Sequence, residues 1–85
     1  MNTMITLENI TRINNIVRAN YYAESDSKDV GFIEYDLHTK RILRHEYTKN
    51  DNKYINHPSI SKAVKAIQTL AIHNVFPKRY RYMWY

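Results

Sequence analysis

The strongest pattern of apolar positions in this chain lies between residues 58 and 74. Apolar side chains recur there every three or four residues, which is the spacing of one helix face. Pro58 suits the first helical position, where no backbone donor is missed. Asn74 can adopt the left-handed conformation that ends helices, and Pro77 follows soon after. The pattern predicts a helix over 58–74. Its apolar face comprises Ile60, Ala63, Val64, Ile67, Leu70 and Ala71.

Upstream of this helix, apolar and polar residues alternate in the period of half-buried strands. The stretch 16–24 alternates around two tyrosines, and the stretches 30–37 and 41–48 resemble a hairpin. Asp36 can hydrogen-bond into the hairpin turn through its side chain. Lys40 stands where glycine would be easier, so the turn is expected to be slightly strained.

The faces of the predicted hairpin favour one register. This register gathers the apolar side chains on one side and places Glu34 opposite Arg44, an opposite-charge pair. A slip by one residue would scatter the apolar side chains and lose that pair. We expect the face from Ile33 to Leu43 to lie under the helix. The predicted pairs are Leu37–Arg41, Tyr35–Leu43, Ile33–His45 and Gly31–Tyr47.

The first fourteen residues and the connection after the hairpin give weaker patterns. Leu7, Ile10, Ile13 and Val17 have the spacing of a short amphipathic helix, with Thr6 as a candidate cap, but the asparagines of this segment are poor helix formers and its state stays open. The connection over residues 49–56 is polar, and we expect its Tyr54 and Ile55 to anchor it to the core.

Together these segments predict one α+β domain over residues 1–85. A three-stranded antiparallel sheet is covered on one face by the helix, and the aromatic tail, residues 78–85, can add a strand because its aromatics also lie at period two.

Composition narrows the classes of partner and compartment. Thirteen Lys and Arg against 8 Asp and Glu give a net charge of +5, which suits nucleic acid, a nucleotide or an acidic protein surface, although many small soluble proteins are simply basic. The absence of cysteine excludes disulfides and thiolate metal sites. No basic region precedes the first apolar residues, and no apolar run approaches the ~20 residues of a membrane span. We expect a cytosolic protein that does not enter a membrane.

The tail combines cations with aromatic rings. Cations neutralise phosphates and aromatics stack on bases, a combination typical of single-stranded nucleic-acid binding. The same residue types anchor protein interfaces, and they can also fold back to complete a small core. These three interpretations remain open. The candidate residues are Lys78, Arg79, Tyr80, Arg81, Tyr82, Trp84 and Tyr85.

Two lysines at the start of the helix are further candidates. The run Ser-Lys-Ala-Val-Lys-Ala over residues 61–66 follows three predicted strands. In this respect the chain resembles the double-stranded-RNA-binding domain, which runs helix, three strands, helix and contacts phosphates through lysines at the start of its second helix. The resemblance implies that Lys62 and Lys65 contact phosphates; they can equally be solvated. The chain departs from this family at two places. The family's Gly-Pro-x-His loop is replaced by the acidic segment 25–29, and the family's doubled lysine before the alanine is absent.

The sequence contains few of the motifs that catalysis or metal binding would need. The histidines show no paired spacing that would suit a zinc site. The single glycine excludes a phosphate-cradling loop, and no cysteine nucleophile or nucleophile elbow is present. Carboxylates of the hairpin could pair with His45 for acid–base work, but in the predicted register Glu34 and Asp36 point to the other face. We expect no enzyme, cofactor or metal. The four histidines are His38, His45, His57 and His73.

These observations favour a binding function. Abundant Asn, Ile, Lys and Tyr, which A/T-rich codons encode, suggest a low-GC bacterium or its phages. The expected function is a small phage- or mobile-element-encoded inhibitor, of the anti-CRISPR kind, that occludes a bacterial protein or nucleoprotein. The alternatives are a nucleic-acid or nucleotide binder using Lys62, Lys65 and the tail, and an oligomerisation module, such as a homodimer, in which the tail pairs with a neighbouring subunit.

Overall fold

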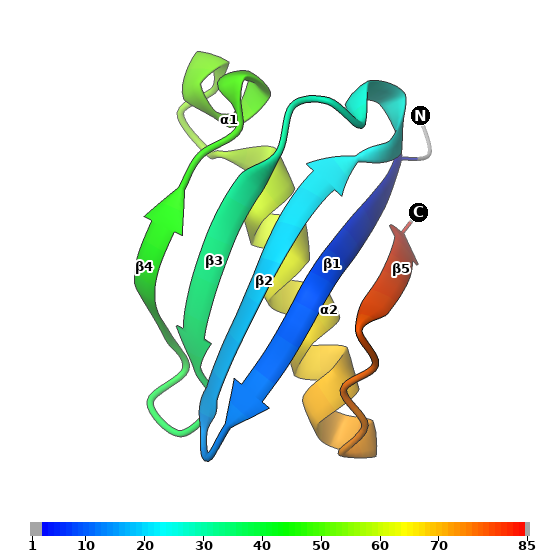
Figure 1. Ribbon diagram of the computed structural model, residues 1–85. Helices are drawn as coiled ribbons and strands as arrows, with labels where there is room; N and C mark the ends of the chain where they lie inside the picture. The colour runs from blue at the N-terminus through cyan, green and yellow to red at the C-terminus, as the bar shows by residue number, and fades with distance from the viewer. Residues whose placement is uncertain (1–2, 85) are drawn as a thin grey trace.

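A five-stranded antiparallel sheet, covered on one face by a single long helix, makes up the fold (Figure 1). The computed structural model describes residues 3–84. The strand order is β4-β3-β2-β1-β5. The predicted α+β class is confirmed, but the sheet has five strands rather than three. The elements are β1 (Thr3–Ile13), β2 (Ile16–Ala23), a 3-10 turn η1 (Glu24–Asp26), β3 (Gly31–Asp36), β4 (Arg41–Glu46), α1 (Lys49–Lys53), α2 (Pro58–His73) and β5 (Arg79–Trp84).

The N-terminal segment, where the pattern allowed a short helix, forms the long strand β1 instead. A bulge lies between Glu8 and Thr11, where Asn9 has a positive φ of 55°. The extra residue keeps both Leu7 and Ile10 on the buried face although they are three positions apart. That interval is also a helical interval, which explains why the pattern allowed a helix. It also removes the helix-first topology on which the RNA-binding-domain resemblance depended.

The tail does form the predicted additional strand. β5 pairs antiparallel with β1 of the same chain, from Arg79 opposite Glu8 to Trp84 opposite Thr3. Because β1 also pairs with β2, this long strand lies inside the sheet, and β4 and β5 are the edges. Tyr85 lies outside the described residues.

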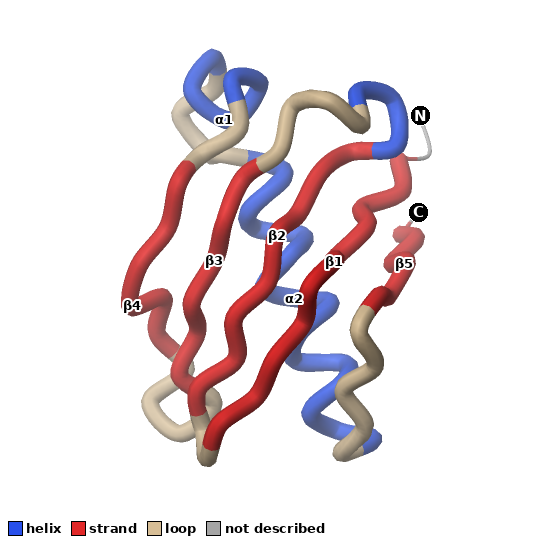
Figure 2. The backbone as a smooth tube through the Cα atoms, viewed as in Figure 1, coloured by secondary structure: helices blue, strands red, loops and turns tan. Residues whose placement is uncertain are grey.

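The β3–β4 hairpin is confirmed, with a change of register at its middle. Ile33 pairs with His45 and Glu34 with Arg44 as predicted. A bulge at Leu43 then shifts the register, and the β4 trace makes a jog (Figure 2). The predicted pairs Tyr35–Leu43 and Leu37–Arg41 are therefore wrong. The pairing between β3 and β4 begins at Phe32 and Glu46, so it does not include the predicted pair Gly31–Tyr47. The pairs observed after the bulge are Tyr35–Ile42 and Asp36–Arg41.

The turn of this hairpin has the predicted chemistry. Asp36 Oδ1 accepts hydrogen bonds from the backbone N–H groups of His38 (2.8 Å) and Thr39 (3.3 Å). These bonds, the one from His38 first, lower the pKa of Asp36. Lys40 has a φ of 60°, which confirms that a strained residue stands where glycine would be easier.

Helix α2 matches its predicted bounds, and Asn74 ends it in the left-handed conformation, with a φ of 53°. Its start depends on a residue that the sequence analysis did not single out. The side chain of Asp51, fully buried in α1, accepts from the backbone N–H groups of Ser59 (2.6 Å) and Ile60 (3.0 Å). This carboxylate caps α2, whose N-cap residue His57 makes no side-chain cap of its own.

The connection between β4 and α2 otherwise differs from the prediction. It contains the short helix α1, whose first N–H groups are capped by Asp29 and Thr48. Tyr54 and Ile55 are exposed, so the prediction that they anchor this segment is wrong. Asp51 anchors it instead.

The core lies between α2 and one face of the sheet. Alternate residues of β2 face α2, as predicted. Four of the six predicted positions of α2 are buried, Ile60, Ala63, Ile67 and Leu70, together with Ser59 and Ala66, whereas Val64 and Ala71 are only partly buried. The opposite face of the sheet is open to solvent. The core residues are Ile5, Leu7, Ile10, Val17, Ala19, Tyr21, Ile33, Tyr35, Ile60, Ala63, Ala66, Ile67 and Leu70.

Candidate functional site

A groove opens between the C-terminal half of α2 and the β3–β4 hairpin. It has a volume of about 410 Å³, within the range of ~300–1,000 Å³ that ligand sites occupy. We call it the hairpin groove. It is lined by Tyr35, Leu37, Lys40, Gln68, Ala71 and Ile72.

The groove exists because α2 crosses the sheet diagonally. The helix begins behind β3 and ends on the β1 and β5 side of the sheet (Figure 1). Its C-terminal end is held there by Arg12 of β1, which donates to Asn74 Oδ1 (2.9 Å) and lies 4.9 Å over the ring of Phe76. The hairpin end of β3 and β4 is consequently left uncovered, and all six residues of β4 are exposed.

A polar pair marks the floor of the groove. Gln68 Nε2 donates to the Tyr35 hydroxyl at 3.0 Å. Tyr35 is only 2% exposed, so its ring forms the floor while its hydroxyl meets α2. This pair links the helix to the sheet at this point.

Apolar side chains continue beyond the groove on both sides. Ile72 of α2 is 82% exposed, and Ile42 and Leu43 of β4 are 39% and 46% exposed. Ile42 pairs with Tyr35, and residues paired across two strands point to the same face of the sheet, so Ile42 extends the groove wall. These residues form an apolar surface that nothing in the described chain covers.

The rim of the groove carries positive charge. Lys40 lines it from the hairpin turn. Lys65 lies on the same stripe of α2 as Gln68 and Ile72, because positions three, four and seven apart share a helix face. Thus Lys65, a residue of the predicted site, lies on the helix stripe that borders the groove, although it does not line the groove itself.

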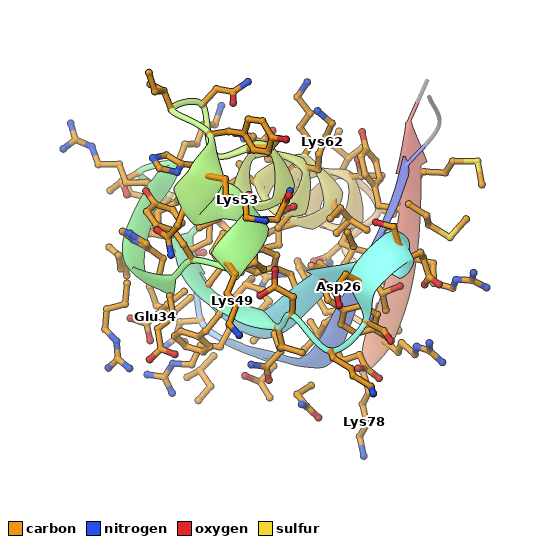
Figure 3. The ribbon with its side chains drawn as sticks, turned by 90° about the horizontal axis from the view of Figure 1, so that it is seen from above. Asp26, Glu34, Lys49, Lys53, Lys62 and Lys78 are labelled. Carbon is orange, nitrogen blue, oxygen red and sulfur yellow. The ribbon has the colours of Figure 1, made fainter. Side chains whose placement is uncertain are left out.

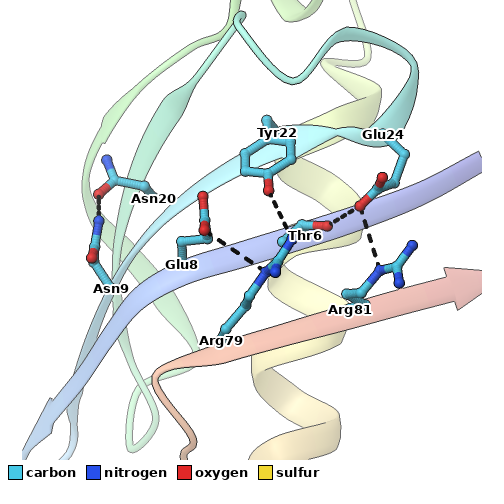
Figure 4. Close-up of polar contacts among 8 residues, drawn as sticks. All are labelled: Thr6, Glu8, Asn9, Asn20, Tyr22, Glu24, Arg79 and Arg81. Atoms are coloured by element: carbon cyan, nitrogen blue, oxygen red, sulfur yellow. Dashed lines mark hydrogen bonds and ion pairs between the residues drawn. The ribbon is translucent and has the colours of Figure 1, made fainter.

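The tail residues of the predicted site divide between two faces of the sheet. Tyr80 and Tyr82 are partly buried against the core. Arg79 lies 3.8 Å from Glu8 and Arg81 lies 3.5 Å from Glu24 on the open face (Figure 4). Arg79 also donates to Tyr22, and this hydrogen bond is the first cause of its raised pKa. Trp84 ends β5, and its side chain lies outside the described part of the chain.

The lysine of the tail is not brought together with the first lysine of the helix. Lys62, at the start of α2, and Lys78, just before β5, point to opposite sides of the molecule (Figure 3). A single nucleic-acid site using both is therefore not assembled by this fold, and the binding role of each stays a prediction.

Two of the four histidines, His45 and His57, contact the ring of Tyr47. His57 stacks on Tyr47 at 4.1 Å between ring centroids, and Tyr47 lies 4.3 Å from His45. His57 Nδ1 is 2.9 Å from the backbone oxygen of Asp51. Within residues 3–84, no group of three or more potential ligands is arranged to hold a metal ion.

The sequence analysis missed the groove. Its only signals were a mixed helix stripe at Gln68 and Ile72 and the run Arg-Ile-Leu-Arg at residues 41–44, which is too apolar for an exposed strand.

Comparisons with known proteins do not assign this chain to a family. No protein-family model matches the chain, and neither the curated proteins nor the solved structures gave a match. In the described part of the chain, none of the helices has the length and apolar character needed to cross a membrane.

Proposed function

We propose that this chain is a small, non-enzymatic binding protein that docks on a bacterial protein or nucleoprotein and occludes part of its surface. An inhibitor encoded by a phage or mobile element, of the anti-defence or anti-CRISPR kind, has this form of action. The observation that carries the proposal is the hairpin groove with its uncovered apolar flanks, since contiguous exposed apolar surface marks interaction sites.

The other surfaces support this choice by their internal pairing. On the open face of the sheet, arginines already pair with glutamates, as in Arg18–Glu34 and Arg81–Glu24. The tail aromatics Tyr80 and Tyr82 already pack on the core. These groups have partners within the chain, whereas Ile42 and Ile72 have large exposed surfaces without such a role.

The test is affinity capture from a low-GC bacterial lysate with three tagged proteins: the natural chain, Ile72→Asp and Ile55→Asp. Ile55 is 99% exposed and lies outside the groove, so its variant is a matched control for adding one exposed carboxylate. We expect a stoichiometric protein to survive nuclease treatment with the natural chain and with Ile55→Asp, and to be lost with Ile72→Asp.

Two results would contradict the proposal. Equal capture by Ile72→Asp would place the binding surface elsewhere. Loss of all captured material on nuclease treatment would favour the nucleic-acid alternative based on Lys62, Lys65 and the tail.

A further inference from the structure

We infer that the hairpin groove receives an acidic segment of a partner protein, which inserts one large apolar side chain between α2 and the hairpin. This inference rests on the proposed function and specifies the chemistry of the partner. It is carried by three features of the groove: its apolar walls, the unused hydrogen-bond donors on its floor and the charge of its rim.

The walls fit an apolar anchor that belongs to a macromolecule. Leu37, Ala71 and Ile72 line the groove together with the ring of Tyr35, and the volume of about 410 Å³ exceeds what one leucine or phenylalanine side chain needs. Ile72 and Ile42 extend the apolar surface outside the groove. A small ligand would leave these residues in water, whereas a protein segment lying across the groove would cover them.

The floor of the groove carries hydrogen-bond donors that are not all used within the chain. A tyrosine hydroxyl has one donor and a glutamine amide has two, and the bond between Gln68 and Tyr35 uses one of them. Whichever way the amide is oriented, this pair keeps donors that no acceptor within residues 3–84 satisfies. Acceptor oxygens of a partner, a carboxylate or a backbone carbonyl, satisfy these donors.

The rim selects for negative charge. Lys40 lines the groove and Lys65 lies on the adjoining stripe of α2. The nearest carboxylate in sequence, Asp36, follows Tyr35 in β3 and so points to the other face of the sheet, where it bonds to the turn. A second copy of this chain, with its net charge of +5, is a poor match for this rim.

A peptide-display selection on the immobilised full-length chain tests the inference without knowing the partner. The library presents random twelve-residue peptides, and the selected peptides are synthesised for affinity measurements. We expect enrichment of peptides that combine a large apolar residue with two or more Asp or Glu. Their affinity should fall at least tenfold with Lys40→Glu and with Ile72→Asp, and by less than twofold with Lys28→Glu.

Lys28→Glu is the matched control because Lys28 follows η1, at the end of the sheet opposite the β3–β4 hairpin (Figure 1). Chemical-shift mapping with a selected peptide supplies a second readout. The largest shifts should fall on residues 35–42 and 68–72. Enriched peptides that are neutral or basic, no enrichment at all, or shifts confined to the open face of the sheet would each overturn the inference.

The capture experiment and the peptide selection fail in different ways. If the protein captured from lysate is lost with Ile72→Asp but retained with Lys40→Glu, the groove is the docking site, but the inference that it receives an acidic segment is wrong. If it is retained with both variants, the proposed docking surface itself is wrong.

Discussion

At the scale of single residues, Asp51 joins three elements of the fold through its buried carboxylate. Its carboxylate accepts from the N–H groups of Ser59 and Ile60 and from the Tyr21 hydroxyl (2.8 Å), all away from solvent. Asp51→Ala leaves these donors unpaired and should lower the free energy of unfolding by about 3 kcal/mol. Urea denaturation measures this loss. Asp26→Ala removes an exposed carboxylate and is the control, so an equal loss in both variants would contradict the assigned role.

Tyr21 gives a second prediction, about alkaline pH. Burial, and then the hydrogen bond to Asp51, raise the pKa of the Tyr21 phenol above its ordinary value of about 10. A raised pKa means that the stabilisation is complete below about pH 10 and is lost as the pH rises beyond it toward the folded-state pKa.

The free energy of unfolding should therefore decrease above about pH 10, and Tyr21→Phe should reduce that slope by up to about 1.4 kcal/mol per pH unit. Thermal unfolding scans between pH 8 and about pH 11 measure it. Tyr54→Phe, at a half-exposed position, is the control, and an identical slope in Tyr21→Phe and the natural chain would exclude this account.

At the scale of elements, β5 decides between two interpretations of the tail. It pairs with β1 along its length, and Tyr80 and Tyr82 pack on the core. Deleting residues 78–85 should lower the free energy of unfolding by about 3 kcal/mol or more, because β1 loses a neighbour and the core loses two aromatic side chains. Circular dichroism and solution mass determine the outcome.

Arg81→Ala is the control for that deletion, since an exposed ion pair contributes at most about 1 kcal/mol. A truncated chain that stays folded but changes its mass in solution would instead favour the oligomerisation alternative, in which the tail pairs with a neighbouring subunit.

The elements also show which features a sequence pattern can predict. Helix α2, strands β2 to β4 and the capping role of Asp36 followed from period and turn chemistry. Bulges account for the errors in β1 and in the register of the hairpin, because each inserts one residue and changes the period along the strand. At Asn9 the bulge imitated a helical interval, and at Leu43 it moved that side chain away from its predicted partner Tyr35. The short helix α1 and the buried carboxylate of Asp51 had no periodic signal at all.

The candidate site was less predictable than the fold for a related reason. The groove depends on the crossing angle of α2, which the contact of Arg12 with Asn74 helps to fix across sixty-two positions of sequence. No local pattern carries such a contact. The amino-acid counts likewise gave the net charge of +5 but not its distribution over the surface. Lys62 and Lys78, both candidates from the sequence, lie on opposite sides of the molecule (Figure 3).

At the scale of the whole molecule, this distribution of charge predicts how the chain responds to salt. Lys62 and Lys78 point away from each other, and Arg79 and Arg81 are paired with glutamates, so one nucleic-acid strand cannot contact all four of these candidate cations on a single face (Figure 3). Three phosphate contacts would give a slope of log affinity against log salt of about −2 for a single strand. We expect oligothymidine binding, measured by fluorescence anisotropy, to be weak, with a slope no steeper than this.

The two lysines provide the controls for this prediction. Because they lie on opposite sides, Lys62→Ala and Lys78→Ala should not both weaken oligothymidine binding, and neither variant should alter the affinity of an acidic peptide for the hairpin groove. A slope of about −4 or steeper, together with weakening by both substitutions, would mean that the strand wraps around the molecule. The basic surface would then be the binding site, and the proposal that the hairpin groove is the functional site would be wrong.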